Sequence, residues 1–205
     1  SVADVTPTNF AAGASGAATA TFTTANPVPA DGKFVITFPT NFDVSVATVT
    51  DITGQGGNAG TGHTISCTGQ VCTVARGASD GPGTFTAGVT TVVFGAVKNP
   101  EVSGSTGTFT ITSTTNSNVM IDTLATVSAV TITPGVIINA GVVRVSFVAG
   151  ASGTATATFT TANPVPADGK FVITFPANFN VAGATVSAFG GITGQGGPAG
   201  TGHTI

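Results

Sequence analysis

Polar and apolar residues alternate along much of this chain with a period of two. The runs TATFTT, GTFTITSTT and ATVSAVTIT each place small polar residues between apolar ones. This alternation is typical of half-buried strands, and the abundant β-branched residues Thr and Val pack well on a pleated surface. No stretch of even ten residues has helical periodicity. The pattern therefore predicts an all-β protein.

Turn residues divide roughly the first 135 residues into about nine strands. Pro27, Val28 and Pro29, followed by Asp31 and Gly32, separate the second and third strands, and the DGPG sequence at 80–83 separates two later ones. Short strands with frequent turns predict a two-sheet sandwich. The expected strands are residues 2–10, 17–24, 33–39, 46–51, 63–68, 71–76, 88–97, 106–115 and 124–133, with a short piece near 118–121.

Phenylalanine supplies most of the expected hydrophobic core of this sandwich, because it recurs at the apolar positions of the alternating pattern. The alternating pair Val35 and Ile36, and Ile111, join it. The expected core residues are Phe22, Phe34, Phe38, Phe85, Phe94 and Phe109, with the Val35–Ile36 pair and Ile111.

The chain also repeats itself. Residues 13–49 return as residues 150–186, at an offset of 137, and 32 of these 37 positions are identical. The period is about the size of one domain, which predicts tandem β-sandwich repeats of about 137 residues. We expect a complete repeat in residues 1–137 and the first half of a second copy in residues 138–205. Because a half-domain exposes strand edges and an apolar face, we expect residues outside this sequence or a neighbouring subunit to complete it.

Charged residues are scarce, at 6% of the chain, where soluble domains usually have about 25%. The net charge is −3, and the five basic residues are scattered: Lys33, Arg76, Lys98, Arg144 and Lys170. This distribution excludes a basic patch for nucleic acid or an anionic membrane surface. No apolar run reaches the length of a membrane span, so membrane insertion is not expected.

Threonine makes up about a fifth of the residues. Strand propensity explains much of this bias. A surface with so few charges also needs neutral polar groups, and the hydroxyls are candidate acceptors for O-linked glycans. The sequence contains no Asn-X-Ser/Thr acceptor, so any glycan is expected to be O-linked.

Cys67 and Cys72 are the only cysteines, and they flank a predicted two-residue turn at Gly69 and Gln70. In such a hairpin Cys67 lies opposite Cys72, at a separation that suits a disulfide. A zinc site with His63 supplies at most three ligands where four are usual. We expect the disulfide, with a metal site and two free thiols as alternatives. A disulfide would indicate an oxidising, extracytoplasmic location.

Other chemical motifs in the sequence are weak. The GASDG string at 77–81 matches a nucleophile elbow, but Pro82 prevents the helix that this motif needs. The Gly-rich segment 53–64 lacks the Lys of a phosphate loop, and His63 recurs at the same repeat position as His203. Asp31 and Asp168 lie in predicted turns, and acidic residues do not cluster near the repeat junction, which disfavours calcium.

Two segments carry a resemblance to a known class of protein. KFVITFPTNFDV at 33–44 and VKNPEVSGSTGTFTITSTT at 97–115 resemble immunoglobulin-like β-sandwich repeats of microbial surface proteins, of the S-layer, adhesin-stalk and extracellular-fibre type. The resemblance implies a structural role at the cell surface, and it implies no functional residues.

We therefore expect a structural repeat protein of an extracellular filament, sheath or cell-surface layer, with copies of itself as partners. We expect no catalytic residues, no cofactor and no metal. The alternative is an adhesin or glycan-binding surface module. Such modules usually bind through Trp or Tyr, and the sequence contains neither.

Overall fold

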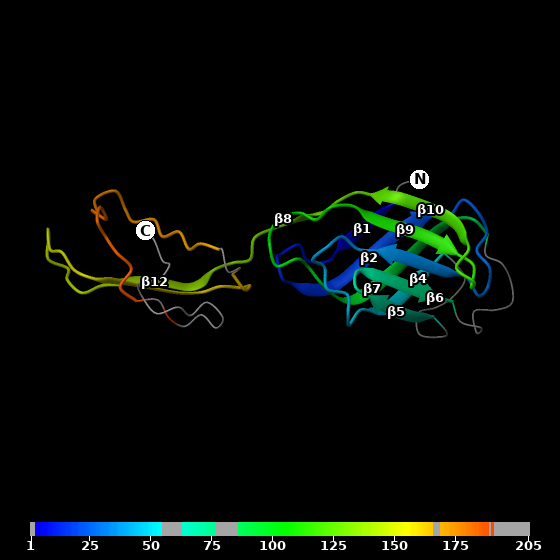
Figure 1. Ribbon diagram of the computed structural model, residues 1–205, viewed down its shortest axis with the longest axis horizontal. Helices are drawn as coiled ribbons and strands as arrows, with labels where there is room; N and C mark the ends of the chain where they lie inside the picture. The colour runs from blue at the N-terminus through cyan, green and yellow to red at the C-terminus, as the bar shows by residue number, and fades with distance from the viewer. Residues whose placement is uncertain (1–2, 55–62, 77–85, 166–168, 189, 191–205) are drawn as a thin grey trace. The chain divides into compact units, whose positions relative to one another are not determined.

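The computed structural model describes residues 3–54, 63–76, 86–165, 169–188 and 190, and the regular structure of these residues consists of strands (Figure 1). The predicted all-β class is confirmed. The chain divides into two compact units, Ser1–Asn163 and Pro164–Ile205. This division falls inside the second copy of the sequence repeat, after the first hairpin of that copy.

The first copy of the repeat folds as two antiparallel sheets. One sheet has the order β1-β2-β7-β4 and the other the order β10-β9-β3-β6-β5. The first contains β1 (Asp4–Pro7), β2 (Ser15–Thr23), β7 (Val89–Lys98) and β4 (Thr48–Thr53). The second contains β10 (Met120–Val127), β9 (Phe109–Thr114), β3 (Lys33–Thr37), β6 (Val71–Ala75) and β5 (Thr64–Thr68). Two smaller pairs are β8 (Gly104–Ser105) with β11 (Thr131–Ile132), and β12 (Ile138–Arg144) with β13 (Ala155–Thr160).

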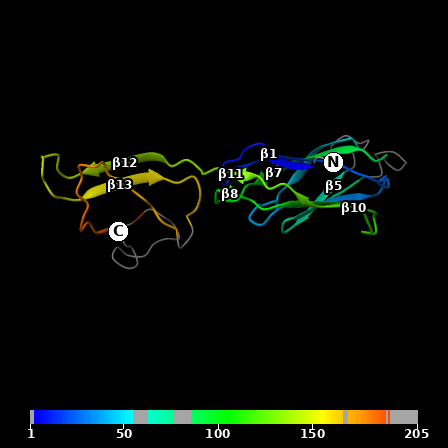
Figure 2. The same ribbon diagram turned by 90° about the horizontal axis from the view of Figure 1, so that it is seen from above.

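The hydrophobic core of the first copy lies between these two sheets (Figure 2). Edge-to-face ring contacts join the sheets, with ring centroids 5.3 Å apart for Phe22 and Phe34 and 5.5 Å apart for Phe38 and Phe94. Such a pair contributes about 0.5–1.5 kcal/mol beyond the area that it buries. These predicted core residues are all at most 4% exposed: Phe22, Phe34, Phe38, Phe94, Phe109, Ile36 and Ile111. Val35, which alternates with Ile36, is half-buried. Phe85, also predicted, lies outside the described residues.

The structure differs from the sequence prediction at three strands. The strand expected at 2–10 ends at Pro7, and Ala11 instead pairs in parallel with Thr133. The strand expected at 106–115 begins only at Phe109, after Gly107, where φ is +85°. The last predicted strand, at 124–133, is replaced by the end of β10 (Met120–Val127) and the short β11 (Thr131–Ile132). The short piece near 118–121 merges into β10, because Thr115–Val119 form the turn of a β9–β10 hairpin.

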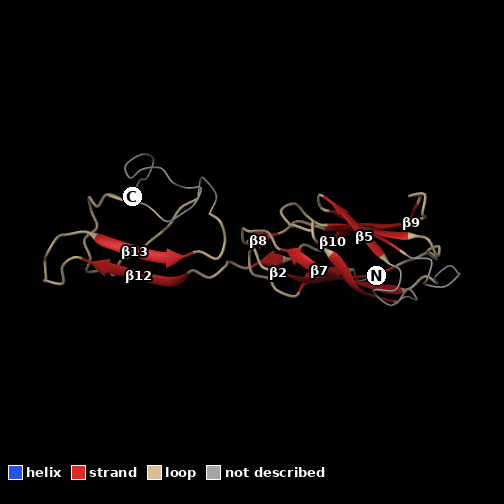
Figure 3. Ribbon diagram, turned by 90° about the horizontal axis from the view of Figure 1, so that it is seen from below, coloured by secondary structure: helices blue, strands red, loops and turns tan. Residues whose placement is uncertain are grey.

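The hairpin β12–β13 belongs to the second copy of the repeat and reproduces the pairing of β1 with β2 (Figure 3). Val5 lies opposite Ala20 in the first copy, and Val142 lies opposite Ala157 in the second. Each residue of the second pair lies 137 positions after its counterpart in the first pair. The two copies therefore share the register of this hairpin as well as its sequence. Local sequence is therefore sufficient to set this pairing, independently of the strands that follow it in the first copy.

Candidate interaction surfaces

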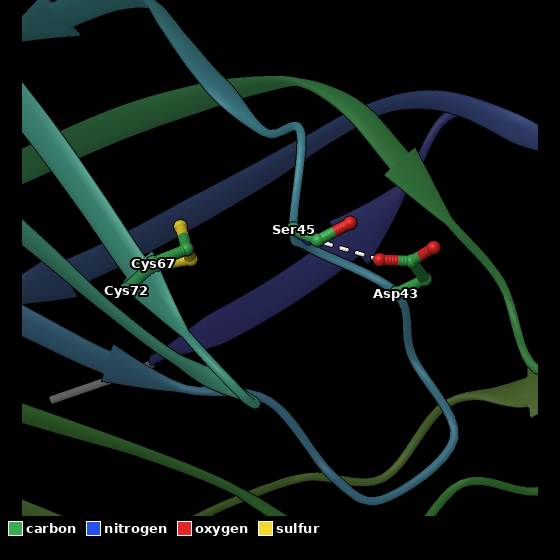
Figure 4. Close-up of a disulfide and its surroundings, with 4 residues drawn as sticks. All are labelled: Asp43, Ser45, Cys67 and Cys72. Carbon is green, nitrogen blue, oxygen red and sulfur yellow. Dashed lines mark hydrogen bonds between the residues drawn. A yellow bond between two sulfur atoms is a disulfide. The ribbon is translucent and has the colours of Figure 1, made fainter.

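The cysteines lie in the hairpin of β5 and β6, which turns at Gly69 and Gln70. Cys67 is directly opposite Cys72, and a disulfide joins them (Figure 4). Neither cysteine is a free thiol, so the metal site and the free-thiol pair are not what the structure contains. Cys72 is fully buried and faces the core, and Cys67 is partly buried against it.

The disulfide lies at an edge of its sheet. Strand β5 is an edge of its sheet and pairs only with β6 among the described residues. The bridge ties this edge strand to its neighbour across a sequence separation of five residues. A covalent link of this kind stabilises mainly by restricting the unfolded chain, and a short loop gives a local effect.

A turn at one end of the sandwich places an acidic and a basic residue beside each other. Asp43 and Lys98 exchange two backbone hydrogen bonds of 3.0 and 2.9 Å. Asp43 Oδ1 accepts a 2.9 Å hydrogen bond from the Ser45 N–H (Figure 4). Hydrogen bonds from the Ser45 side chain and backbone lower the pKa of Asp43. Lys98 Nζ donates to Glu101 Oε1 at 2.8 Å, and this hydrogen bond raises the pKa of Lys98.

Asp43 and Lys98 line a hollow of about 510 Å³ together with segments 40–41 and 99–106. Its charged groups are already engaged, since Lys98 pairs with Glu101 and Asp43 accepts from Ser45. A general acid–base pair needs groups whose pKa values are tuned towards neutrality. The pKa of Asp43 is shifted downwards and that of Lys98 upwards, away from neutrality in both cases. Neither shift moves the pKa of these two groups towards neutrality.

Threonine hydroxyls cover the solvent-facing sides of both sheets. On one sheet the Oγ1 atoms of Thr112 and Thr123 are 3.5 Å apart, and on the other those of Thr21 and Thr91 are also 3.5 Å apart. The alternate positions on these strands, such as Ile111 and Phe22, are buried. The strand alternation thus separates a Phe-rich interior from a neutral, hydroxyl-rich surface.

The structure describes only some of the weaker motifs singled out in the sequence. The GASDG string, most of the Gly-rich segment, Asp168 and His203 lie outside the described residues. Asp31 lies in a turn, as predicted, and His63 is half-buried just before β5. Across the described ranges, His, Cys, Asp and Glu form no group of three that could hold a metal ion.

Among the residues that the structure describes, no helix is long and apolar enough to cross a membrane.

The second copy exposes apolar residues whose counterparts in the first copy are buried. Each counterpart pair is separated by 137 residues in the sequence. The exposed fractions rise from 0% for Val5 to 48% for Val142, from 0% for Ile36 to 45% for Ile173, from 2% for Phe42 to 38% for Phe179, and from 0% for Val44 to 44% for Val181. In the first copy the two sheets that enclose these positions include β6, β7, β9 and β10, which follow Ile65 in the sequence. The exposure of the counterparts in residues 138–205 is therefore not evidence of a site.

Comparisons with known proteins give no family for this chain. No family model matches, and no curated protein matches. Among solved structures, the chain is similar to a non-cellulosomal cohesin from the hyperthermophilic archaeon Archaeoglobus fulgidus, at 11% identity and a TM-score of 0.35. The match covers 64% of this chain and 90% of that one. At this level the likeness is distant, and no function is transferred from it.

Proposed function

We propose that this chain is a structural repeat protein of an extracellular filament, sheath or cell-surface layer, without catalytic activity, and that its partners are copies of itself. One observation carries the proposal: residues 13–49 return almost unchanged as residues 150–186, and the first hairpin of each copy pairs in the same register. Repetition at this fidelity favours a role in length and spacing. We include in the proposal that further residues or a neighbouring subunit supply the strands that follow Ile65 in the first copy.

The properties of the first copy support the same role. Its outer faces carry neutral hydroxyls and few charges, so close approach of another copy meets little electrostatic repulsion. The Cys67–Cys72 bridge persists in oxidising compartments, which supports an extracellular location. Exposed threonines on both sheets are acceptors for O-linked glycans, which we include in the proposal.

Self-association is tested on the purified chain by sedimentation velocity and negative-stain imaging over a range of concentrations. We expect the sedimentation coefficient to rise with concentration, and elongated or layered particles to form. A chain that stays dispersed and monomeric at every concentration would contradict the proposal. If such dispersed molecules bound a glycan panel, the protein would instead be an adhesin.

A matched pair of variants identifies the surface involved. Ile173→Lys places a charge at a position whose counterpart, Ile36, is fully buried in the closed copy. Thr174→Lys places the same charge at the neighbouring position, which is exposed. We expect the first variant to lose association and the second to keep it. Equal behaviour of the two variants would mean that copies associate elsewhere.

Mass spectrometry of the protein from its native source tests the glycan part of the proposal. We expect added hexose or related sugar masses on Thr- and Ser-containing peptides of the outer faces. Unmodified peptides throughout would remove O-glycans from the proposal and leave the self-association intact.

A further inference from the structure

The turn that precedes β2 is held in place by a residue distant in the chain. Asn99, which is 3% exposed, donates from Nδ2 to the Ala11 carbonyl oxygen at 2.9 Å. The Ala14 N–H donates to the same carbonyl oxygen at 3.1 Å and closes the turn. We call residues 11–14 the junction turn, because the chain leaves the first copy beside it.

Two segments of the chain attach to the junction turn. On the way out, Thr133 donates its N–H to the Phe10 carbonyl oxygen and accepts from the Ala12 N–H, both at 2.8 Å. On the way back from the β12–β13 hairpin, Asn163 Nδ2 donates to the Ala12 carbonyl oxygen at 2.8 Å, in a partly buried contact. All of these residues belong to the unit Ser1–Asn163. The hairpin is therefore attached to the first copy at both of its ends.

Two glycines leave the space that Asn163 occupies. A Cβ atom added to Gly13 would collide with the Asn163 side chain. A Cβ atom added to Gly135 would lie 2.7 Å from Asn163 Nδ2 and 2.9 Å from the Ala162 Cβ. Gly13 has a φ of +68°, so its backbone also favours glycine, but Gly135 is not among the glycines with positive φ. The space that Ala162 and Asn163 need is therefore what explains a glycine at position 135.

Both partners of this contact belong to repeated segments. The segment ANPVPADGK, which contains the asparagine, occurs at 25–33 and 162–170, and the turn segment AGASG occurs at 12–16 and 149–153. The second turn has the same backbone form as the first, with a φ of +73° at Gly150. Each copy thus carries a turn of this form and an asparagine that matches it.

We propose that the junction turn is the docking site for the ANPVPADGK asparagine of the copy that follows, and that this contact holds successive copies at a fixed spacing. The proposal rests on the repeat function proposed above and names a contact between neighbouring copies. Asn163 supplies the hydrogen bond, and Gly13 and Gly135 supply the space. Because Thr133 anchors the linker at the same turn, the following copy does not rotate about a single connection.

A competing explanation is that Asn163 contacts the turn only for want of the partner that Asn26 has. Asn26 Nδ2 donates to Asp122 Oδ1 at 2.7 Å, and the counterpart of Asp122 in the second copy lies outside this sequence. A carboxamide has two N–H donors, so one asparagine can donate to its own copy and to the preceding turn at once. The space at Gly135 also favours docking, since a contact made only by default would need no glycine there.

Double electron–electron resonance tests the docking contact in the full 205-residue chain. Spin labels are attached through Thr123→Cys on β10 and Thr156→Cys on β13, at two exposed positions. Cys67 and Cys72 are joined in a disulfide and take no label. Labelled chains are diluted with unlabelled chains, so that only distances within one chain are measured. We expect one narrow distance distribution, and a broad distribution would overturn the proposal.

Two variants with the same change of side chain test the hydrogen bond. Asn163→Asp replaces the N–H donor by a carboxylate oxygen facing the Ala12 carbonyl, and Asn178→Asp adds the same charge at an exposed position. We expect Asn163→Asp to raise the ratio of undocked to docked chains at least about fivefold, because one hydrogen bond changes an equilibrium by about this factor. Asn178→Asp should keep the parent distribution. Equal distributions in the two variants would overturn the proposal.

Glycine variants test the space. Gly13→Ala and Gly150→Ala both place a Cβ atom at a positive φ, so their backbone strain is matched. At Gly13 this atom meets the Asn163 side chain, whereas at Gly150 no described atom lies within 4 Å of it. We expect Gly13→Ala to broaden the distance distribution and Gly150→Ala to leave it unchanged. Gly135→Ala should also broaden it, without backbone strain. Distributions as narrow as the parent's in both Gly13→Ala and Gly135→Ala would overturn the docking site.

The two proposals fail in distinguishable ways. A chain that self-associates but has a broad distance distribution would keep the structural role and remove the docking contact. A chain that has a narrow distribution and never self-associates would keep the docking contact and remove the filament or layer function.

Discussion

The two copies of the repeat compare the same sequence with and without its tertiary partners. Each copy forms the first hairpin in the same register. Among the described residues, only the first copy has β7 beside this hairpin and β6 and β9 beside β3. Its Val5 and Ile36 are fully buried, whereas Val142 and Ile173 are about half exposed. Local pairing is thus set by nearby sequence, and burial depends on strands distant in the chain.

Completion of the second copy should produce the largest effect on this comparison. In an extended chain, residues 66–134 are placed again after Ile205, the counterpart of Ile65. We expect the free energy of opening at residues 155–160, measured by hydrogen exchange, to rise from near zero by about 5 kcal/mol or more. The control extension carries Asp at the counterparts of Val92 and Phe94, and it should give little protection. Rapid exchange in the unsubstituted extension would show that the second copy does not close as the first does.

Truncation of the same core residue in each copy should give unequal effects. Phe38 is 2% exposed and contacts Phe42, Phe94 and Phe109, whereas its counterpart Phe175 is half-buried. We expect Phe38→Ala to lower the free energy of unfolding of the first copy by about 3–5 kcal/mol. Phe175→Ala should change it by about 0.5 kcal/mol or less. Urea unfolding followed by circular dichroism measures both, and equal losses would contradict the comparison.

Removal of the disulfide should have a smaller effect, confined to the first copy. A Cys67→Ala, Cys72→Ala double variant loses a link that closes a loop of about six residues, worth about 2 kcal/mol in the chain-entropy description. We expect the unfolding midpoint in urea to fall accordingly, with β13 exchange unchanged. An unchanged urea midpoint would mean that the disulfide adds no stability beyond the pairing of β5 with β6.

The smallest effect concerns a turn that the two copies build with different residues. Asp43 Oδ1 accepts from the Ser45 N–H at 2.9 Å, and its counterpart Asn180 accepts from the Ala182 N–H at 3.0 Å. Because the pKa of Asp43 is lowered below 3.8, its contribution to stability is present above that pH and is lost as the pH falls through the folded-state pKa.

The variant Asp43→Asn should therefore keep the turn and remove this contribution to acid sensitivity. Carboxyl NMR titration of the parent chain measures the pKa of Asp43, and unfolding at about pH 7 and about pH 3 compares the two proteins. We expect a slightly smaller loss of stability on acidification in the variant. A variant as acid-sensitive as the parent would assign the sensitivity to other carboxylates.

Local sequence was a good guide to hairpins and a poor guide to distant pairing. The turn at Gly69 and Gln70 correctly placed Cys67 opposite Cys72, because a two-residue loop determines the register of its strands. The pairing of Gly104–Ser105 with Thr131–Ile132 was not predicted, because alternation indicates a strand at Thr131–Ile132 without indicating its partner, and Gly104–Ser105 has no alternating pattern. Phe42 was likewise not assigned to the core, because it follows β3 in an irregular segment, where no periodicity indicates which side chains are buried.

The sequence by itself determined the strand class, the hairpin registers and most of the core, because alternation and turn residues act over a few positions. Only the tertiary structure decided which of two identical segments is buried. Burial of ATATFT requires the apolar side chains of Val92 and Phe94 about 70 residues further along the chain. A segment without that partner keeps its pairing and leaves its apolar face open.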